Sequence, residues 1–209
     1  MWEELSTEFK TAFEEAWTAF MNGNIPIGAV VCDGNGNILI REHNRTAESG
    51  PVNRKIAHAE MNAISRIDTS EVNVKSVVLY TTMEPCPMCM GTAVMSNIRH
   101  LRYAARDPYC GAVHLKEDDP YLRSQDLDYT HTGGAAEFVQ LVLQSYHELK
   151  CIESGSSDAV LRRFSEVYGE AVETARKLFA YKKLDDMALK DVPVKDVCDM
   201  IAGTVSWKN

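Results

Sequence analysis

The sequence lacks both of the features that direct a chain into or across a membrane. Its 209 residues contain no apolar run of about 18 residues, the length that indicates a transmembrane helix. The N-terminal stretch MWEELSTEFKTAFEEAW is acidic and amphipathic, and it has neither the basic nor the apolar region of a signal peptide. We therefore expect a cytoplasmic protein that has no membrane partner.

Basic residues are also scarce relative to acidic ones. The chain has 22 Lys+Arg against 30 Asp+Glu, which gives a formal net charge of -8, and no stretch is polybasic. A negative global field repels phosphate, although a local basic patch can still bind it. A nucleic-acid partner is therefore possible but not favoured. With 45% hydrophobic residues, the chain can bury a sizeable core.

The cysteines do not form a closely spaced framework. Thiols stay reduced in the cytosol, which argues against structural disulfides. Only one pair is close in sequence, in YTTMEPCPMCMGTAVMS. That pair is a redox couple, half of a structural metal site or half of a catalytic one. The six cysteines are Cys32, Cys86, Cys89, Cys110, Cys151 and Cys198.

Strand and helix patterns alternate along the first part of the chain, which predicts an α/β fold with a partly parallel sheet. Residues 109–134 read as a long irregular segment. The polar stretch 153–158 is the best domain boundary, so we expect a zinc-binding domain over residues 1–150 and a helical C-terminal extension over 151–209. We expect helices over 4–21, 57–67, 86–97, 135–149 and 159–184, and strands over 27–33, 38–44, 74–82 and 100–106.

A third metal ligand is available upstream in KIAHAEMNAI, where His58 precedes Glu60 by two residues. Zinc with three nitrogen or sulfur ligands keeps a fourth position for water and lowers the pKa of that water to about 7. A carboxylate beside the metal can then move protons from the water to a departing amine. His58, Cys86 and Cys89 would hold Zn²⁺, and Glu60 would transfer protons. A closed structural site completed by Cys110 or His114 and a thioredoxin-type redox pair remain as alternatives.

The order His-x-Glu followed by Pro-Cys-x-x-Cys resembles the signature of the cytidine deaminase-like superfamily of zinc-dependent nucleobase and nucleoside deaminases. The resemblance extends over about residues 25–149. It is strongest to the branch of tRNA adenosine deaminase, guanine deaminase and fungal-type cytosine deaminase. It implies a three-layer α/β/α fold with a five-stranded mixed sheet, a homodimer, Zn²⁺ on His58, Cys86 and Cys89, and Glu60 as the catalytic proton shuttle.

The same resemblance implies a set of substrate contacts. IPIGAVV matches the segment that walls the base pocket, HNR matches a strand-end asparagine that binds the base, and AARD matches a stretch whose Asp lies near the ribose. Backbone groups at the start of the first ligand helix and at the turn before Cys86 would approach the base. The expected substrate-binding residues are Ile27, Gly28, Ala29, Asn44, Ala59, Pro85 and Asp107.

The substrate is less well defined than the reaction. PIGAVV, HNR and AARD resemble the tRNA enzymes, but the chain is acidic, and its last matching helix lacks their terminal basic cluster. We therefore expect a small purine or pyrimidine base or nucleoside, with a guanine-type substrate preferred. A tRNA-specific adenosine deaminase is the alternative. A non-catalytic interaction module is disfavoured because Glu60 is intact.

One structural feature would separate these readings. Roofing of the zinc site by the C-terminal helices or by residues 109–134 would exclude an anticodon loop. An open site with a basic rim would favour tRNA. The rim residues would be Arg45, Arg54, Lys55, Arg102 and Arg106.

Overall fold

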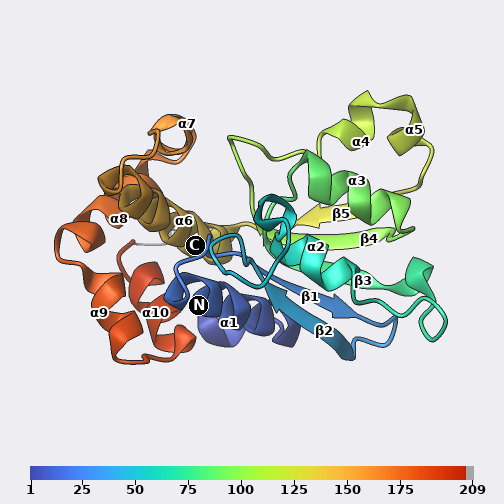
Figure 1. Ribbon diagram of the computed structural model, residues 1–209, viewed down its shortest axis with the longest axis horizontal. Coiled ribbons are helices and arrows are strands. Elements are labelled where there is room, and N and C mark those ends of the chain that lie inside the picture. Colours follow the sequence, from blue (N-terminus) through green and yellow to red (C-terminus); the bar gives the residue numbers. More distant parts are fainter. Residues whose placement is uncertain (206–209) are drawn as a thin grey trace.

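A computed structural model describes residues 1–205, which fold around a mixed five-stranded sheet (Figure 1). The spatial order is β2-β1-β3-β4-β5. β1 pairs antiparallel with β2 and β3, whereas β3, β4 and β5 are parallel. The predicted α/β class and mixed sheet are confirmed. The strands are β1 Gly28–Cys32, β2 Ile38–His43, β3 Val78–Met83, β4 His100–Ala105 and β5 Asp128–His131.

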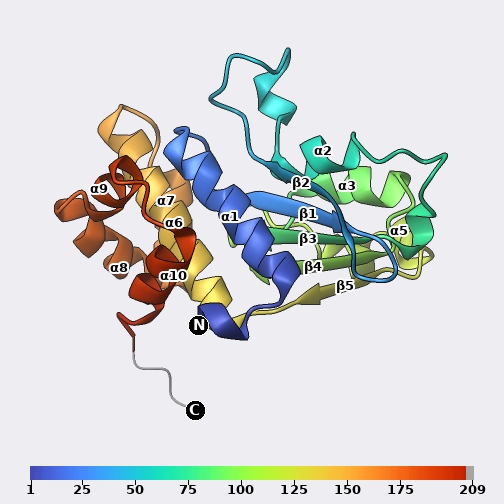
Figure 2. The same cartoon turned by 90° about the horizontal axis from the view of Figure 1, so that it is seen from below.

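Helices cover both faces of the sheet and complete the three layers (Figures 1 and 2). α2 (Ala59–Ile64) and α3 (Pro87–Met95) share one hydrophobic cluster with the sheet. α1 (Thr7–Met21) and α6 (Gly134–Glu153) contact the strands from the other face. Because the apolar sides of these helices are buried on both faces, the sheet is largely shielded from solvent.

The C-terminal extension is helical, as predicted, and packs against α1 and α6 on the side away from the sheet (Figure 2). The single helix expected over 159–184 is wrong. The chain breaks at Tyr168, and it breaks again at Lys182, where φ is +48°. The extension shares one hydrophobic cluster with α1 and α6, and the division at residue 150 stays a prediction. Its helices are α7 Ala159–Val167, α8 Gly169–Ala180, α9 Lys183–Leu189 and α10 Val194–Ala202.

The segment 109–134 is more regular than its sequence indicated. It contains α4 (Leu115–Asp118), α5 (Pro120–Arg123) and the edge strand β5. β5 escaped detection because only Tyr129 of its four residues is buried. The expected strand over 74–82 begins four residues late, because its first part is a 3₁₀ turn. The 3₁₀ helices are η1 Trp2–Glu4, η2 Arg54–Ile56 and η3 Val74–Ser76. Within residues 1–205, no helix has the length and apolar character needed to cross a membrane.

Helix α1 lies unusually close to the first residue of β1. A Cβ atom added at Gly28 would lie 2.0 Å from the Ala12 carbonyl oxygen and 2.6 Å from the Ala16 nitrogen. Both atoms belong to helix backbone and have no rotamer by which to retreat. The absence of a side chain at Gly28 therefore sets the distance between α1 and the sheet.

We predict that Gly28→Ala lowers the free energy of unfolding by roughly 3 kcal/mol, because the helix must move to admit the methyl group. Gly91→Ala is the matched control, since nothing lies within 4 Å of a Cβ at that position in α3. It should raise stability by about 0.5–1 kcal/mol through helix propensity. Urea unfolding measures both, and equal effects of the two substitutions would contradict the close approach.

Burial also makes the stability of the fold depend on pH. His147 of α6 is 9% exposed, and burial, aided by the charge of Lys150, lowers its pKa to about 4. In the unfolded chain the same imidazole has a pKa of about 6.5. Below that pH the unfolded state binds the extra proton, so this contribution to stability is lost as the pH falls from 6.5 towards 4.

We predict that His147 alone lowers the free energy of unfolding by about 2 kcal/mol between pH 8 and pH 5. His147→Gln removes this titration, so its unfolding free energy should change less over the same interval, whatever its value at pH 8. Urea unfolding at the two pH values measures the difference. Parallel pH profiles for the wild type and the variant would show that His147 is not held neutral.

Candidate active site

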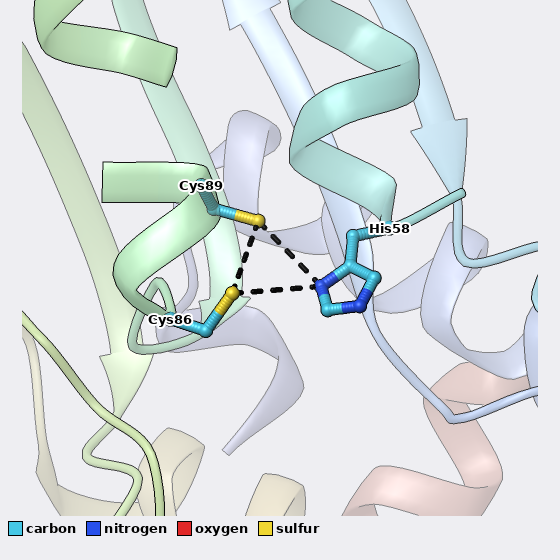
Figure 3. A group of neighbouring side chains, drawn as sticks. All are labelled: His58, Cys86 and Cys89. Atoms are coloured by element: carbon cyan, nitrogen blue, oxygen red, sulfur yellow. Dashed lines mark hydrogen bonds between the residues drawn. The ribbon is translucent and has the colours of Figure 1, made fainter. Parts of the chain in front are cut away.

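Three side chains from two helix starts converge on one point (Figure 3). His58 is the N-cap residue of α2, and Cys86 is the N-cap residue of α3. Cys89 lies in the first turn of α3, so both sulfurs face the imidazole. The His58 Nδ1 atom lies 3.7 Å from the Cys86 Sγ and 3.6 Å from the Cys89 Sγ, and the two sulfurs are 3.6 Å apart.

These distances fit a tetrahedral zinc ion. With Zn–S bonds of about 2.3 Å and Zn–N bonds of about 2.0 Å, ligand atoms at tetrahedral corners are separated by about 3.5–3.8 Å. No other group of three potential His, Cys, Asp or Glu ligands converges in this way within residues 1–205. Three protein ligands leave one coordination position open, which is the arrangement of catalytic rather than structural zinc.

The local sequence explains why the ligands are placed here. Pro87, not Pro85, occupies the first helical position of α3, where its fixed φ suits a helix start. The positive ends of the α2 and α3 dipoles meet at the site and favour thiolate. The hydrogen bond with the Cys89 thiol, assisted by His58, lowers the pKa of Cys86 to about 4. The same hydrogen bond, with burial, raises the pKa of Cys89, so of the two thiols Cys86 ionises first.

Neither proposed fourth protein ligand belongs to this group. The Cys110 Sγ lies 3.1 Å from the Asp107 Oδ2, and Cys110 is exposed. His114 precedes α4 and faces a different hollow. The geometry therefore favours the catalytic reading over a closed structural site. A thioredoxin-type pair would leave the contact of both sulfurs with His58 unexplained.

Glu60 is buried beside the ligands without being one of the three. It is 3% exposed, its Oε1 accepts a hydrogen bond from the Thr81 hydroxyl at 2.9 Å, and its Oε2 lies 3.5 Å from the Cys89 Sγ. Burial raises the pKa of this carboxyl group. Thr81 orients one oxygen and leaves the other towards the metal ligands. No sequence pattern marked Thr81, since it is one residue of a buried strand.

A cavity of about 190 Å³ opens onto the site. Of the predicted substrate contacts, Ile27, Asn44 and Asp107 line it. The Asn44 Oδ1 accepts hydrogen bonds from the Thr46 backbone N–H at 3.0 Å and hydroxyl at 2.7 Å. Its buried Nδ2 has no partner among the described residues, so a donor remains for a ligand acceptor.

The other four predicted contacts do not line this cavity. Gly28 abuts α1, and Ala29 lies in the hydrophobic cluster beneath α2. Ala59 is fully buried at the start of α2. The Pro85 carbonyl accepts a hydrogen bond from the Ala112 N–H at 3.0 Å. Their contact with substrate stays a prediction.

Sequence reasoning missed one whole wall of the cavity. α6 contributes Gln144 and Glu148, and α7 contributes Val160 and Phe164. The Gln144 Nε2 donates to the Glu148 Oε1 at 2.8 Å, and burial raises the pKa of Glu148. The spacing of four between Gln144 and Glu148, which places them on one face of the helix, was a usable signal for the α6 pair. The α7 residues had no such signal, because their place depends on tertiary packing.

The C-terminal extension therefore helps to enclose the site, the feature expected of a small-substrate enzyme. None of the five predicted rim cations lines the cavity. Two of them form ion pairs, Arg45 with Glu42 at 2.9 Å and Arg102 with Asp128 at 2.6 Å. Arg106 instead lines a neighbouring groove.

Comparison with known proteins agrees with this geometry. Residues 3–105 match the family model described as the cytidine and deoxycytidylate deaminase zinc-binding region. A tRNA-specific adenosine deaminase of Rickettsia felis is 36% identical over 141 residues, which are 65% of this chain and 94% of that protein. The chain belongs to this family of zinc-dependent hydrolytic deaminases. Zn²⁺ is accordingly its metal, with a three-residue ligand group placed to hold it.

Other relatives of this deaminase fall in the same group. The tRNA-specific adenosine deaminase of Bacillus subtilis is 41% identical over 105 residues, which are 49% of this chain but only 62% of that protein. A solved structure from studies of A-to-I editing by tRNA:A34 deaminases at the wobble position of transfer RNA has 31% identity and a TM-score of 0.52. It covers 60% of this chain and 96% of that one.

A more distant solved structure supports the fold alone. NE0047 in complex with 2,6-diaminopurine has a TM-score of 0.54 at 19% identity, covering 67% of this chain and 79% of that one. The predicted three-layer fold is thus confirmed by the arrangement of helices around the sheet and by these solved structures. The predicted homodimer stays a prediction.

We predict that Cys86→Ser sharply lowers bound zinc, because it removes one of three ligands. Cys110→Ser is the matched control and should keep full zinc, since that thiol bonds to Asp107 instead. Metal content of the purified variants, measured by atomic emission, checks both. Loss of zinc from the Cys110 variant would instead indicate that Cys110 is a fourth ligand of a structural zinc site.

Proposed function

We propose that this protein deaminates adenosine in tRNA by zinc-dependent hydrolysis, producing inosine and ammonia. The observation that carries the reaction is the buried Glu60 carboxylate 3.5 Å from a sulfur of the His58, Cys86 and Cys89 group. Two relatives named tRNA-specific adenosine deaminase, which are 36% and 41% identical, support tRNA adenosine as the substrate.

The chemistry divides between metal and protein. When bound by His58, Cys86 and Cys89, zinc supplies a Lewis acid that makes a water molecule acidic near neutral pH. The Glu60 carboxylate takes a proton from the attacking water and returns it to the leaving nitrogen. A C–O bond forms at the amine-bearing carbon, the C–N bond breaks, and ammonia leaves. Thr81 holds the Glu60 Oε1, so the other oxygen is kept near the reacting atoms.

The cavity offers few but directional polar groups to a base. The free Nδ2 of Asn44 would donate to a ring nitrogen of adenine, and Ile27 and Phe164 would cover its apolar surface. A base extruded from an RNA loop needs only the base itself to enter the cavity. The wall made by α6 and α7 excludes a whole anticodon loop from the cavity, so this substrate requires the loop backbone to stay outside while only the extruded base enters.

The relatives support this reading more than the guanine-type substrate that the sequence favoured. That preference rested on the resemblance of EPCPMC and of the long segment 109–134. About half of this segment is regular structure, and only Tyr109 and Cys110 of it line the cavity. The acidic net charge supported a small substrate over tRNA in general. A net charge describes the whole surface, whereas binding depends on the field at the site.

A small free aminopurine is the second candidate. Val160 and Phe164 of α7 line a cavity of about 190 Å³, which leaves little room beyond a single base. A free base or nucleoside would be enclosed there without a polynucleotide. The two candidates share the reaction and the residues that perform it.

We predict that the zinc-loaded protein releases ammonia from an adenosine-containing tRNA anticodon stem-loop, with inosine as the product. Glu60→Gln should lower the rate by at least about 10²-fold while zinc is retained, because the proton-transfer group is lost. Coupled ammonia detection and nucleoside chromatography measure both. Release only from adenine or guanine compounds offered as free bases or nucleosides would select the second candidate, and release from neither these nor the stem-loop would overturn both.

A further inference from the structure

A second hollow adjoins the zinc cavity and has a different chemical character. This groove has a volume of about 640 Å³, more than three times that of the zinc cavity. Glu84, Asp107 and Tyr109 line both hollows, so the groove continues from the cavity. A ligand with its base beside Glu60 can therefore extend into the groove. The cavity accommodates a base, and the groove has room for a nucleotide-sized group.

Three cations from three elements meet in this groove. Arg106 follows β4, Lys116 lies in α4, and Arg163 lies in α7. The Arg163 Nε donates to the Pro108 carbonyl at 3.1 Å, and its Nη1 lies 2.9 Å from the Glu166 Oε2. These contacts fix the guanidinium at the junction between the extension and the catalytic domain. In a chain of net charge -8, this convergence is a local exception.

The two carboxylates in the groove are already engaged by backbone groups. The Glu84 Oε1 accepts from the Val113 N–H at 3.0 Å, and its Oε2 accepts from the Asp107 N–H at 3.2 Å. The Asp107 Oδ1 accepts from the N–H groups of Tyr109 at 2.8 Å and Cys110 at 3.1 Å. Neither carboxylate forms an ion pair with a groove cation among the described residues; Lys116 instead lies 4.0 Å from the exposed Glu117, and Arg163 pairs with the exposed Glu166.

Glycine maintains this arrangement. A Cβ atom at Gly111 would lie 2.5 Å from the Glu84 carboxyl carbon. Any larger residue would push the carboxylate from the backbone groups that hold it. The loop is therefore built around a fixed Glu84.

Aromatic rings complete the lining. Tyr103, Tyr109 and Tyr168 line the groove; Tyr103 is buried and stacks on His131, whereas Tyr109 is 53% exposed. Cationic side chains interleaved with aromatic surfaces are the combination that binds single-stranded nucleic acid, through phosphate contacts and base stacking. His114 lies in the same groove and adds a donor.

We infer that this groove binds the phosphate-bearing part of the substrate while its target base occupies the zinc cavity. Three of the groove residues lie outside the stretch 3–105 that matches the family model. They are Lys116, Arg163 and Tyr168. The inference rests on the proposed function, because it takes a nucleotide as the substrate. It assigns to the C-terminal extension a direct role in substrate binding. The phosphate belongs either to RNA or to a free nucleotide.

The test uses the double variant Lys116→Gln/Arg163→Gln in the full-length protein. Binding of a fluorescent single-stranded adenosine-containing RNA is measured by anisotropy at several salt concentrations in a Glu60→Gln background, so it does not depend on turnover. Each lost phosphate contact should reduce the slope of log affinity against log salt by about 1. Affinity at low salt should fall roughly tenfold or more.

Arg162→Gln is the matched control. Arg162 neighbours Arg163 on α7 and is exposed, but it does not line the groove and pairs with Asp158 at 3.6 Å. Its RNA affinity and salt slope should equal those of the parent protein. Thermal melts and zinc content establish that every variant is folded. An unchanged slope in the double variant, or an equal loss in the Arg162 variant, would overturn the groove assignment.

Kinetics in the Glu60-containing protein distinguish the source of the phosphate. The double substitution should lower kcat/KM for the phosphate-bearing substrate more than for adenosine. A selective loss with the RNA stem-loop indicates RNA, and a selective loss with adenosine 5′-monophosphate indicates a free nucleotide. Equal losses for adenosine and both phosphate-bearing substrates would contradict a phosphate site. If no adenosine compound reacts but the RNA binding difference remains, the proposed reaction fails and the groove stands.

Discussion

The site depends on the meeting of two helix N-termini over β3, the central strand of the sheet. α2 and α3 each begin at a metal ligand, and their first turns place three ligand atoms within 3.7 Å of one another. Strand β3 holds Thr81 under the same point and thereby orients Glu60. The positive dipole ends favour anionic groups at this point, whereas the hydrogen bond with Cys86, burial and the charge of Glu60 raise the pKa of Cys89, so a bound cation would stabilise the site.

The extension is part of the same hydrophobic unit. The Trp17 Nε1 donates to the Val192 carbonyl at 3.1 Å, and the Tyr146 hydroxyl donates to the Asp185 Oδ2 at 2.7 Å. Asp185 also pairs with Lys150 at 2.6 Å. Because these contacts join α1 and α6 to the last helices, the position of Phe164 in the cavity wall is determined by the packing of the whole C-terminal part. Cavity shape and global stability are therefore coupled.

The parts of the site that the sequence revealed are those that neighbouring residues determine. Cys86 and Cys89 share a turn, and His58 and Glu60 share a helix start. Their spacing in the sequence was therefore enough to predict the metal ligands and the neighbouring carboxylate. The wall residues Gln144 and Phe164 are distant in sequence from the ligands and become neighbours only through tertiary packing. The same reason explains β5, whose four residues form a strand because β4 offers a free edge. The break at Tyr168 divided what looked like one amphipathic helix.

The location of the cavity wall along the chain has a consequence for how such an enzyme diversifies. Every residue that holds the metal or moves protons precedes position 90, whereas Gln144, Glu148, Val160 and Phe164 follow position 140. The reacting groups and this wall of the cavity thus occupy separate stretches of polypeptide, although Ile27 and Asn44 of the lining lie in the first stretch. Changes in the second stretch can reshape what enters the cavity while the bond-breaking apparatus stays the same. During synthesis, the metal-binding segment leaves the ribosome well before the wall that completes its pocket.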